Sequence, residues 1–377
     1  MFRDGYDVIA HVFEVVANAG GEARFVGGCV RDYLINKTPI DQSDIDVSVN
    51  LPVEEVARAF RKAGAHVITK YATNIVVFRG MVFEVTSTRM DTNCDGRYAT
   101  MVFTKSFEED ARRRDFTMNA LYMDLDGKVY DYHGGLSDLK SGIVRFIGNP
   151  MERIREDYLR VWRFFRFTCL FAGKVDADGL AACITMKDDE GFRALSKERV
   201  TNEMMKLLNG NMACDVLKIM QDGGVVRALN VGWNDKILEI IAFYDAFRDM
   251  ESIDLTLVRF ASLTYGKVRD DLFVYTRKQK KFLNIYQEIA GNLRSLIDAK
   301  VLFYKFSHQI ALELLFVFCV LNRDACFDLK WAIEYAPPEL PFCRSDFVGQ
   351  VENCNIGEVY LAEVRKWLKD EEERLKP

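Results

Sequence analysis

Two aspartates one residue apart lie in the segment 43–49, where Asp44 and Asp46 alternate with Ile45 and Val47. Alternate residues of a β-strand point to the same face, so the pattern predicts that both carboxylates project together while the apolar side chains enter a core. Neighbouring carboxylates repel each other and are costly unless a cation neutralises them. Mg²⁺ commonly takes one or two carboxylates together with substrate phosphates. The pattern therefore predicts Asp44 and Asp46 as Mg²⁺ ligands, against the alternative of a solvated strand edge.

A third acid, Glu84, interrupts the apolar run 81–86. We expect it on a strand close to the first, as a further metal ligand or as a partner of an attacking hydroxyl group. Three acids around two cations roughly 3.5–4 Å apart would stabilise both the entering and the leaving oxygen of an in-line phosphoryl transfer. We therefore predict Asp44, Asp46 and Glu84 as the catalytic carboxylates.

A glycine pair, Gly27 and Gly28, follows a short apolar run and leads directly into a predicted helix. This arrangement brings backbone N–H groups and a helix N-terminus close to an anion. Arg31 lies on the first turn of that helix, where its planar guanidinium can clamp a triphosphate. Glycines, arginine and aspartates in one short segment predict a site for a metal-bound nucleoside triphosphate.

The elements that must position these residues change type along the chain. The first part alternates short β-rich runs with turn signals, and amphipathic helical patterns replace them from about residue 150 onward. Runs of strands followed by runs of helices indicate separate layers or domains. We therefore predict the α+β class, with a mixed first part of about 145 residues and an almost entirely helical remainder.

The composition is that of an ordinary globular protein, with 49% hydrophobic and 28% charged residues among 377. Nine cysteines, an odd number without a CxxC pair, argue against a disulfide framework and a zinc finger and favour a reducing compartment. The N-terminal segment carries Asp4, Asp7 and Glu14 within its apolar pattern, which predicts an amphipathic helix and not a signal peptide. We expect a cytoplasmic protein without membrane attachment.

The net charge of −5 argues mildly against a nucleic-acid partner, because phosphate contacts need a basic surface. Charge can be segregated locally, however, and the C-terminal run 370–373 is acidic while a basic cluster precedes it. Either run alone is typical of a solvated helix face. The basic cluster is our candidate for gripping an RNA backbone, and it consists of Arg277, Lys278, Lys280 and Lys281.

Three motifs together resemble the class II branch of the polymerase-β-like nucleotidyltransferases, which contains CCA-adding enzymes and bacterial poly(A) polymerases. They are the GGxVRD and DxD pattern described above, RRDFTMNA at residues 113–120 and EDYLR at residues 156–160. The resemblance covers about residues 20–210. It implies that Gly28, Arg31, Asp44 and Asp46 bind the triphosphate and the metals.

The second motif carries further implied roles. By resemblance, Arg114 contacts the nucleotide, and Asp115 with Asn119 holds ribose or fixes the loop that joins two domains. The expected order is a polymerase-β-like nucleotidyltransferase head with a small mixed sheet, followed by an all-α neck, body and tail. We place these domains at residues 1–145, 146–210, 211–300 and 301–377.

The third motif lies in a segment, 155–167, that is predicted to form one helix with Asp157, Arg160 and Arg163 along one side. The simpler interpretation is a salt bridge on an amphipathic helix. Cytosine and adenine both present an amino donor beside a ring-nitrogen acceptor, and an aspartate only accepts hydrogen bonds while an arginine only donates them. An Asp157/Arg160 pair would therefore select C and A, as the family does, which implies Asp157, Arg160, Arg163 and Arg166 as nucleotide-binding residues.

Two further segments support this interpretation. Arg199 and Glu203 lie four apart in a predicted helix, and we expect them to brace the templating segment without touching substrate. Residues 88–99 resemble the loop with which CCA-adding enzymes switch from CTP to ATP, which argues against an enzyme that adds only C.

The sequence thus predicts an enzyme that adds C, C and A to the 3′ end of tRNA from CTP and ATP, with Mg²⁺ as cofactor. A poly(A) polymerase or an enzyme that adds only A to tRNA is the alternative, because the motifs do not separate these activities. A catalytically dead RNA-binding protein is expected to lose one of the three acids, and a small-molecule nucleotidyltransferase has no reason to keep Asp157, Arg160 and Arg163. We expect a monomer, with a dimer left open.

Overall fold

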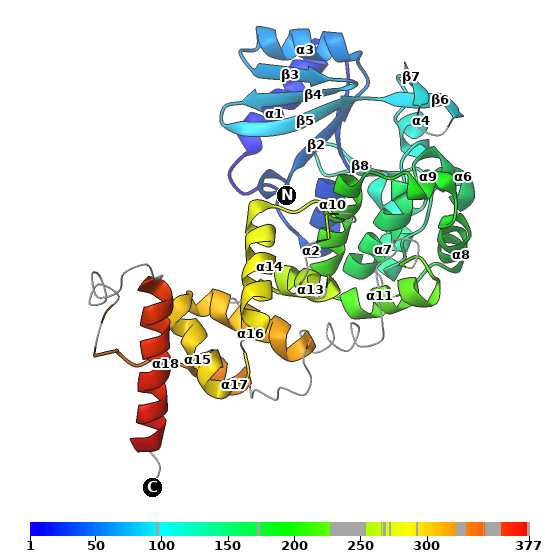
Figure 1. Ribbon diagram of the computed structural model, residues 1–377. Coiled ribbons are helices and arrows are strands. Elements are labelled where there is room, and N and C mark those ends of the chain that lie inside the picture. The colour runs from blue at the N-terminus through cyan, green and yellow to red at the C-terminus, as the bar shows by residue number, and fades with distance from the viewer. Residues whose placement is uncertain are drawn as a thin grey trace. The chain divides into compact units, whose positions relative to one another are not determined.

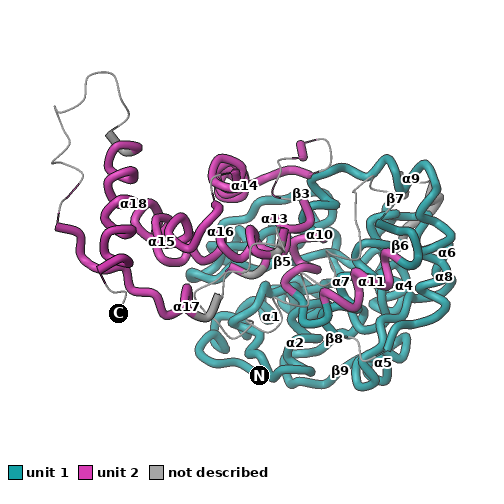
Figure 2. Tube along the Cα trace, turned by 60° about the horizontal axis from the view of Figure 1, so that its bottom comes forward, with its two compact units in different colours: residues 1–203, 210–212, 222–228 teal, residues 204–209, 213–221, 229–377 magenta. Residues whose placement is uncertain are grey.

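The chain forms two compact units (Figure 2). Unit 1 consists of residues 1–203, 210–212 and 222–228, and unit 2 of residues 204–209, 213–221 and 229–377. The structure is a computed structural model that describes residues 1–95, 98–171, 174–226, 254–264, 266, 269–270, 273–291, 293–321, 329–341, 343 and 356–374. The proposed division into head, neck, body and tail stays a prediction.

Unit 1 contains a seven-stranded sheet of order β3-β4-β5-β2-β1-β8-β9 (Figure 1). β2 and β5 are parallel, and every other pair of neighbours in this sheet is antiparallel. The sheet is therefore mixed, as predicted. Its strands are β1 (Ala23–Val26), β2 (Ile45–Val49), β3 (His66–Lys70), β4 (Thr73–Phe78), β5 (Met81–Ser87), β8 (Leu121–Met123) and β9 (Val129–Asp131).

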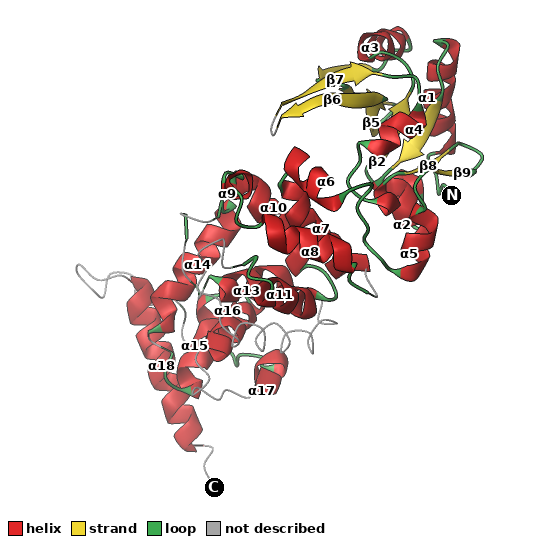
Figure 3. Cartoon of the chain, turned by 90° about the vertical axis from the view of Figure 1, so that its right-hand side faces the viewer, coloured by secondary structure: helices red, strands yellow, loops and turns green. Residues whose placement is uncertain are grey.

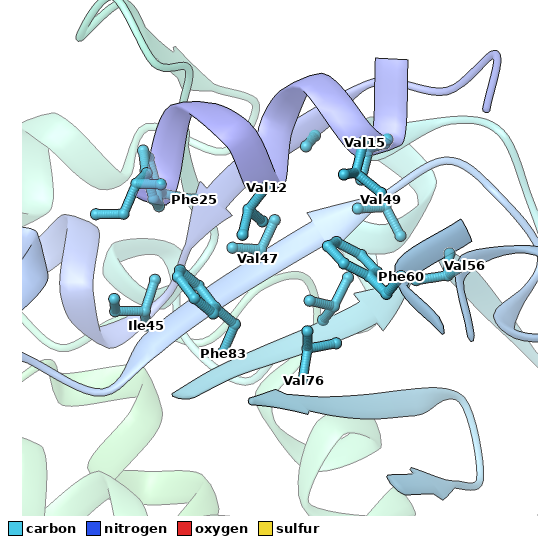
Figure 4. Close-up of a cluster of buried hydrophobic side chains, with 14 of the residues drawn as sticks. Val12, Val15, Phe25, Ile45, Val47, Val49, Val56, Phe60, Val76 and Phe83 are labelled. Atoms are coloured by element: carbon cyan, nitrogen blue, oxygen red, sulfur yellow. The ribbon is translucent and has the colours of Figure 1, made fainter. Parts of the chain in front are cut away.

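One face of the sheet is covered by α1 (Tyr6–Asn18) and α3 (Val53–Lys62), whose apolar sides form a common core with the strands (Figure 4). Val12 of α1, Phe60 of α3, Val47 of β2 and Phe83 of β5 all belong to this core. Side chains alternate along a strand, so the residues next to Val47 and Phe83 point to the opposite face. The hydrophobic core thereby directs the acids of β2 and β5 away from α1 and α3.

A separate two-stranded ribbon, β6 (Arg89–Asp95) with β7 (Tyr98–Phe103), follows β5 (Figure 3). Its base is fixed by Thr88, whose backbone N–H donates to the carbonyl of Val49 at the end of β2 (2.8 Å). The predicted switching loop of residues 88–99 is thus largely a β-ribbon. Gly96 and Arg97, at its tip, lie outside the described residues, as do the side chains from residue 91 to 100.

Helices make up most of the other residues that the structure describes, which confirms the predicted α+β class. Besides α1 and α3, the first part of the chain contains α2 (Gly28–Asn36), α4 (Phe107–Arg112) and α5 (Gly135–Ser141). The later helices are α6 (Pro150–Glu156), α7 (Leu159–Phe171), α8 (Ala177–Met186), α9 (Glu190–Arg193), α10 (Lys197–Leu208), α11 (Ala213–Asp222), α13 (Leu255–Leu263), α14 (Arg277–Ala290), α15 (Leu296–Lys305), α16 (His308–Leu321), α17 (Leu329–Glu334) and α18 (Ile356–Arg374).

The prediction of one continuous helix over 155–167 is wrong. α6 ends at Glu156 and α7 begins at Leu159, because Asp157 between them has an extended backbone (φ −154°, ψ 103°). Its carboxylate Oδ1 accepts the backbone N–H of Leu159 (3.1 Å), which caps the start of α7. Asp157 therefore stands at a break between two helices, not on the side of one.

Unit 2 is helical over its described residues, and its core is formed mainly by α13 to α16. Glu313 interrupts the apolar run of α16 and is buried, where it accepts the backbone N–H of Asp254 (2.9 Å) and a hydrogen bond from Gln309 (2.9 Å). Across the described parts of the chain, we find no helix with the length and apolar character that crossing a bilayer demands.

Candidate active site

The three predicted carboxylates meet where β2 and β5 run side by side. Asp46 lies directly opposite Glu84 in the parallel register, and Asp44 immediately precedes β2. Asp44 and Glu84 are exposed and line a hollow of about 300 Å³ together with Ser43 and Met81. Asp46 is half-buried. The structure thus brings the three acids to one side of the sheet.

Asp46 is affected by burial, by neighbouring acids and by two arginines. Burial and the negative charges of Glu84 and Asp44 raise its pKa to about 6, although Arg114 and Arg31 act in the opposite direction. A cation beside these carboxylates would relieve that repulsion. The site therefore favours binding of positive charge.

The donor set fits a hard divalent cation, because its side-chain ligands are carboxylate oxygens. Among the described residues, no group of three or more histidine, cysteine or acidic side chains is arranged to enclose a metal by itself. Mg²⁺ usually keeps several waters and binds one or two carboxylates with substrate phosphates. Two carboxylates such as those of Asp44 and Asp46 would fit as the protein's share of such a shell.

The glycine loop lies against these acids. Gly27 precedes α2 with φ +73°, a conformation that L side chains rarely adopt. A Cβ atom at this position would lie 3.7 Å from Oδ2 of Asp46 and 3.6 Å from Nη1 of Arg114. Gly28 begins α2, so the helix N-terminus opens beside the acids. This placement is the one the glycine pair predicts for an anion-binding loop.

Arg31 is more constrained than a free phosphate clamp. Its guanidinium donates from Nη1 to Oδ1 of Asn119 (2.7 Å) and from Nε to Oδ1 of Asp32 (2.9 Å). Its Cζ also lies 4.6 Å from the ring centroid of Phe171, and the residue is buried. Because a guanidinium has five N–H donors, Arg31 would contact a triphosphate either with a donor beyond these two or by exchanging one of the acceptors.

Arg114 is fixed by two residues that the motifs do not identify, Asp110 and Tyr122. Nη2 of Arg114 donates to Asp110 (3.2 Å), and Nε donates to the hydroxyl of Tyr122 (3.1 Å). Burial alone would raise the pKa of Asp110, but the charges of Arg114 and Arg113 lower it to about 2. This aspartate is therefore a stable anion inside the protein.

Asp115 joins the second motif to helix α7. Its Oδ1 accepts a hydrogen bond from Asn119 (3.1 Å), and its Oδ2 accepts one from Nε of Arg163 (2.6 Å). Burial would raise the pKa of Asp115, yet Arg163 and Asn119 keep it below its usual range. Of the two roles implied for Asp115 and Asn119, these contacts supply the one of fixing the loop.

Arg166, also on α7, pairs with Glu203 of α10 (2.9 Å), and burial lowers the pKa of Arg166 to about 10. The second predicted brace, Arg199, donates from Nη2 to Oδ2 of Asp157 (2.8 Å). Both residues of α10 therefore contact the segment 157–166, as a bracing role requires, and that role stays a prediction.

Asp157 and Arg160 have different side-chain partners. Arg160 donates to Oε2 of Glu156 (2.6 Å), to the carbonyl of Arg153 (2.8 Å) and to the carbonyl of Arg113 (2.9 Å). The backbone N–H of Arg160 donates to the carbonyl of Asp157 (2.9 Å). The two residues are thus neighbours on one turn, and a base would bind either in addition to these partners or in exchange for one of them.

The basic cluster of unit 2 lies on the first turns of α14. Lys278 pairs with Asp254 (2.8 Å) and Lys280 with Asp270 (2.9 Å), and both lysines are exposed. Two of the four positive charges therefore have acidic partners. The role of this cluster in RNA binding stays a prediction.

Comparison with known proteins agrees with these motifs. Residues 23–145 match the family model described as the poly A polymerase head domain. The chain is 32% identical over 311 residues to the mitochondrial CCA tRNA nucleotidyltransferase 1 of Mus musculus, a match that covers 79% of this chain and 68% of the mouse protein. It is 36% identical over 234 residues to the Danio rerio protein of the same name, which covers 60% of this chain and 52% of that protein.

Solved structures share the fold. The CCA-adding enzyme of Bacillus stearothermophilus in complex with CTP has a TM-score of 0.72 at 24% identity, covering 98% of this chain and 94% of that chain. The Thermotoga maritima CCA-adding enzyme complexed with tRNA has a TM-score of 0.67 at 17% identity, covering 96% and 90%. The resemblance drawn from the three motifs is confirmed: the chain belongs to the family of class II CCA-adding enzymes, the CCA tRNA nucleotidyltransferases.

Proposed function

We propose that this protein adds C, C and A in turn to the 3′ end of tRNA, using CTP and ATP. The observation that carries the proposal is the pairing of Asp46 with Glu84 beside the Gly27 loop and Arg114, which places like-charged acids next to an anion-binding loop. The curated relatives named CCA tRNA nucleotidyltransferase support the choice of reaction.

Membership of the nucleotidyltransferase family implies a divalent metal, and we propose Mg²⁺ with Asp44 and Asp46 as its protein ligands. Bound there, the cation would neutralise charge on the phosphates and make the terminal 3′-hydroxyl of the RNA more acidic. To the N–H groups at the start of α2 and to Nη1 of Arg114 we assign donation to phosphate oxygens. To Glu84, exposed beside Asp46, we assign orientation of the attacking hydroxyl group.

Base selection is assigned to Asp157 and Arg160. The amino group of cytosine or adenine would donate to Asp157, and the ring nitrogen would accept from Arg160. Uracil and guanine offer an oxygen and an N–H in these places, so both protein groups would be left without partners. Arg163 and Arg166 remain in the predicted nucleotide-binding set, but their pairs with Asp115 and Glu203 favour a positioning role.

The test uses purified protein, Mg²⁺ and two tRNA transcripts, one ending at the discriminator base and one ending in CC. Each labelled nucleoside triphosphate is supplied in turn and then in pairs. We expect two C residues from CTP, one A after them from ATP, and no further growth. Long A tails would establish a poly(A) polymerase, and transfer of A to the CC transcript alone would establish an A-adding enzyme.

The partners and location follow the same proposal. tRNA is the proposed acceptor, and CTP and ATP are the proposed donors. The monomeric state stays a prediction from the sequence. So does the cytoplasmic location, since the mouse and human relatives are named mitochondrial.

A further inference from the structure

A fully buried carboxylate, that of Asp110 in α4, lies behind the guanidinium of Arg114. Its Oδ2 accepts hydrogen bonds from Nη2 of Arg114 (3.2 Å) and from the hydroxyl of Tyr122 (2.6 Å). Its Oδ1 accepts from Nε of Arg113 (2.8 Å) and from the backbone N–H of Arg89, the first residue of β6 (3.2 Å). One side chain with no exposed surface thus connects α4, β8 and the base of the ribbon.

Tyr122 completes the contact with Arg114. Its buried hydroxyl donates to Asp110 and accepts from Nε of Arg114 (3.1 Å), and its ring centroid lies 5.3 Å from the Cζ of that arginine. The Nε and Nη2 edge of the guanidinium is therefore fixed from behind. The Nη1 end lies 3.6 Å from the position of a Cβ atom on Gly27, and Oδ2 of Asp46 lies 3.7 Å from the same point.

The geometry points to Asp110 and Tyr122 as positioning residues that direct Nη1 of Arg114 at the phosphates of the incoming nucleotide, an inference that rests on the proposed function. A long arginine side chain loses rotamer freedom when it binds an anion. Fixing the guanidinium beforehand removes that cost from the binding step, so affinity for the triphosphate rises. Neither residue touches the nucleotide itself.

Two substitutions test this role. Tyr122→Phe removes one hydroxyl and keeps the buried ring, and we expect it to raise the Kd for CTP by about fivefold. Asp110→Asn keeps the shape but presents an amide where Arg114 and Tyr122 need an acceptor, and we expect a rise of about thirtyfold. The measurements are equilibrium binding of CTP with Mg²⁺ and steady-state addition of C to tRNA. We expect KM for CTP to rise with Kd while kcat changes little.

The matched control is Asp138→Asn. Asp138 is a partly buried aspartate of unit 1 that also accepts from an arginine, Arg145 (3.2 Å), and from a hydroxyl, that of Thr117 (2.8 Å). We expect this variant to lower the melting temperature and to leave KM for CTP unchanged. If Asp110→Asn and Asp138→Asn shift KM equally, the effect is one of stability and the inference is wrong.

A double-mutant cycle separates positioning from independent action. Arg114→Ala removes the group that is positioned, so adding Tyr122→Phe to it should cause no further loss of CTP binding. Fully additive losses would contradict the inference, as would an unchanged Kd in the single variant Tyr122→Phe. If the wild-type protein binds CTP but adds nothing to tRNA, the proposed function fails while the CTP-binding cycle still decides the role of Asp110 and Tyr122.

Discussion

Two aspartates near Arg114 have opposite electrostatic surroundings. Asp46 is half-buried beside Glu84 and Asp44, and its pKa is raised to about 6 by burial and by their charge. Asp110 is fully buried against Arg114 and Arg113, which lower its pKa to about 2. Arginines hold Asp110 as an anion, whereas Asp46 faces two acids as well as Arg114 and Arg31 and its pKa is raised. The difference suggests that Asp110 shapes the site while Asp46 meets the substrate.

The same contrast extends over the three motifs. Two arginines of α7 form ion pairs, Arg163 with Asp115 and Arg166 with Glu203. Asp46 of β2 and Glu84 of β5 instead lie opposite each other, so each carboxylate has a like charge on the neighbouring strand. Loss of an acid that faces a like charge should therefore reduce catalysis without reducing stability. Loss of an acid that pairs with an arginine should reduce stability.

The largest expected effect is that of Asp46→Ala. Removing this carboxylate should lower the rate of nucleotide addition by roughly a thousandfold or more, since stabilisation by a bound metal is worth several kcal/mol. The melting temperature should not fall, because the variant also removes a like-charge contact. The measurement is single-turnover addition of C to tRNA, with tRNA affinity measured in parallel.

The control for this prediction is Asp124→Asn. Asp124 belongs to the same sheet region but accepts the backbone N–H of Lys128 in the β8–β9 turn (2.9 Å), away from the three acids. Addition of C by this variant should stay close to the wild-type rate. If Asp46→Ala adds C at a rate within tenfold of the wild type, the difference in role inferred for Asp46 and Asp110 is wrong.

A smaller effect is expected for base choice. Asp157→Ala should lower the preference for CTP over UTP by about a hundredfold, because the amino group of cytosine loses its acceptor while the oxygen of uracil no longer faces a carboxylate. Arg199→Ala should lower it by only about fivefold, since Arg199 orients Asp157 through one hydrogen bond of 2.8 Å. Competition between labelled CTP and UTP measures both values.

Glu198→Ala is the matched control for Arg199→Ala, because Glu198 is exposed on the same turn of α10. Its preference for CTP should equal that of the wild type. Unchanged selectivity in Asp157→Ala would show that the base is read elsewhere, and the helix break at this residue would then need another explanation.

The local arrangement of the acids could be predicted from the sequence. The alternation around Asp44 and Asp46 fixes which face they occupy, because the strand period is two. The direct pairing of Asp46 with Glu84 could not be predicted, since it depends on how two strands separated by α3, β3 and β4 come together in parallel. Their register is a property of the whole sheet.

The sequence indicates the ion pairs of Asp110 but neither the contact of Tyr122 nor the helix break at Asp157. The spacing of Asp110 three and four residues before Arg113 and Arg114 is a readable signal for helical ion pairs, and it was missed. Tyr122 gives no such signal, because only the tertiary fold places β8 beside α4. The break at Asp157 is hidden because the apolar spacing on either side continues as in one helix. Sequence patterns therefore predict faces and local pairs, while contacts between distant elements need the structure.

A further expected effect, on stability and not on activity, is a dependence on pH that should distinguish Asp110 from an uncharged residue. The pKa of Asp110 is about 2 in the folded protein, below its ordinary value of 3.8, so its ionised form stabilises the fold above pH 4 and this contribution is lost as the pH falls toward 2. The contribution amounts to about 2 kcal/mol, since one pKa unit corresponds to about 1.4 kcal/mol. Urea unfolding of the wild type and Asp110→Asn at several pH values measures it. The difference in unfolding free energy between the wild type and Asp110→Asn should narrow on acidification, because a protonated carboxyl resembles the amide. A difference that stays constant from pH 5 to pH 2 would mean that the arginines do not stabilise the Asp110 anion.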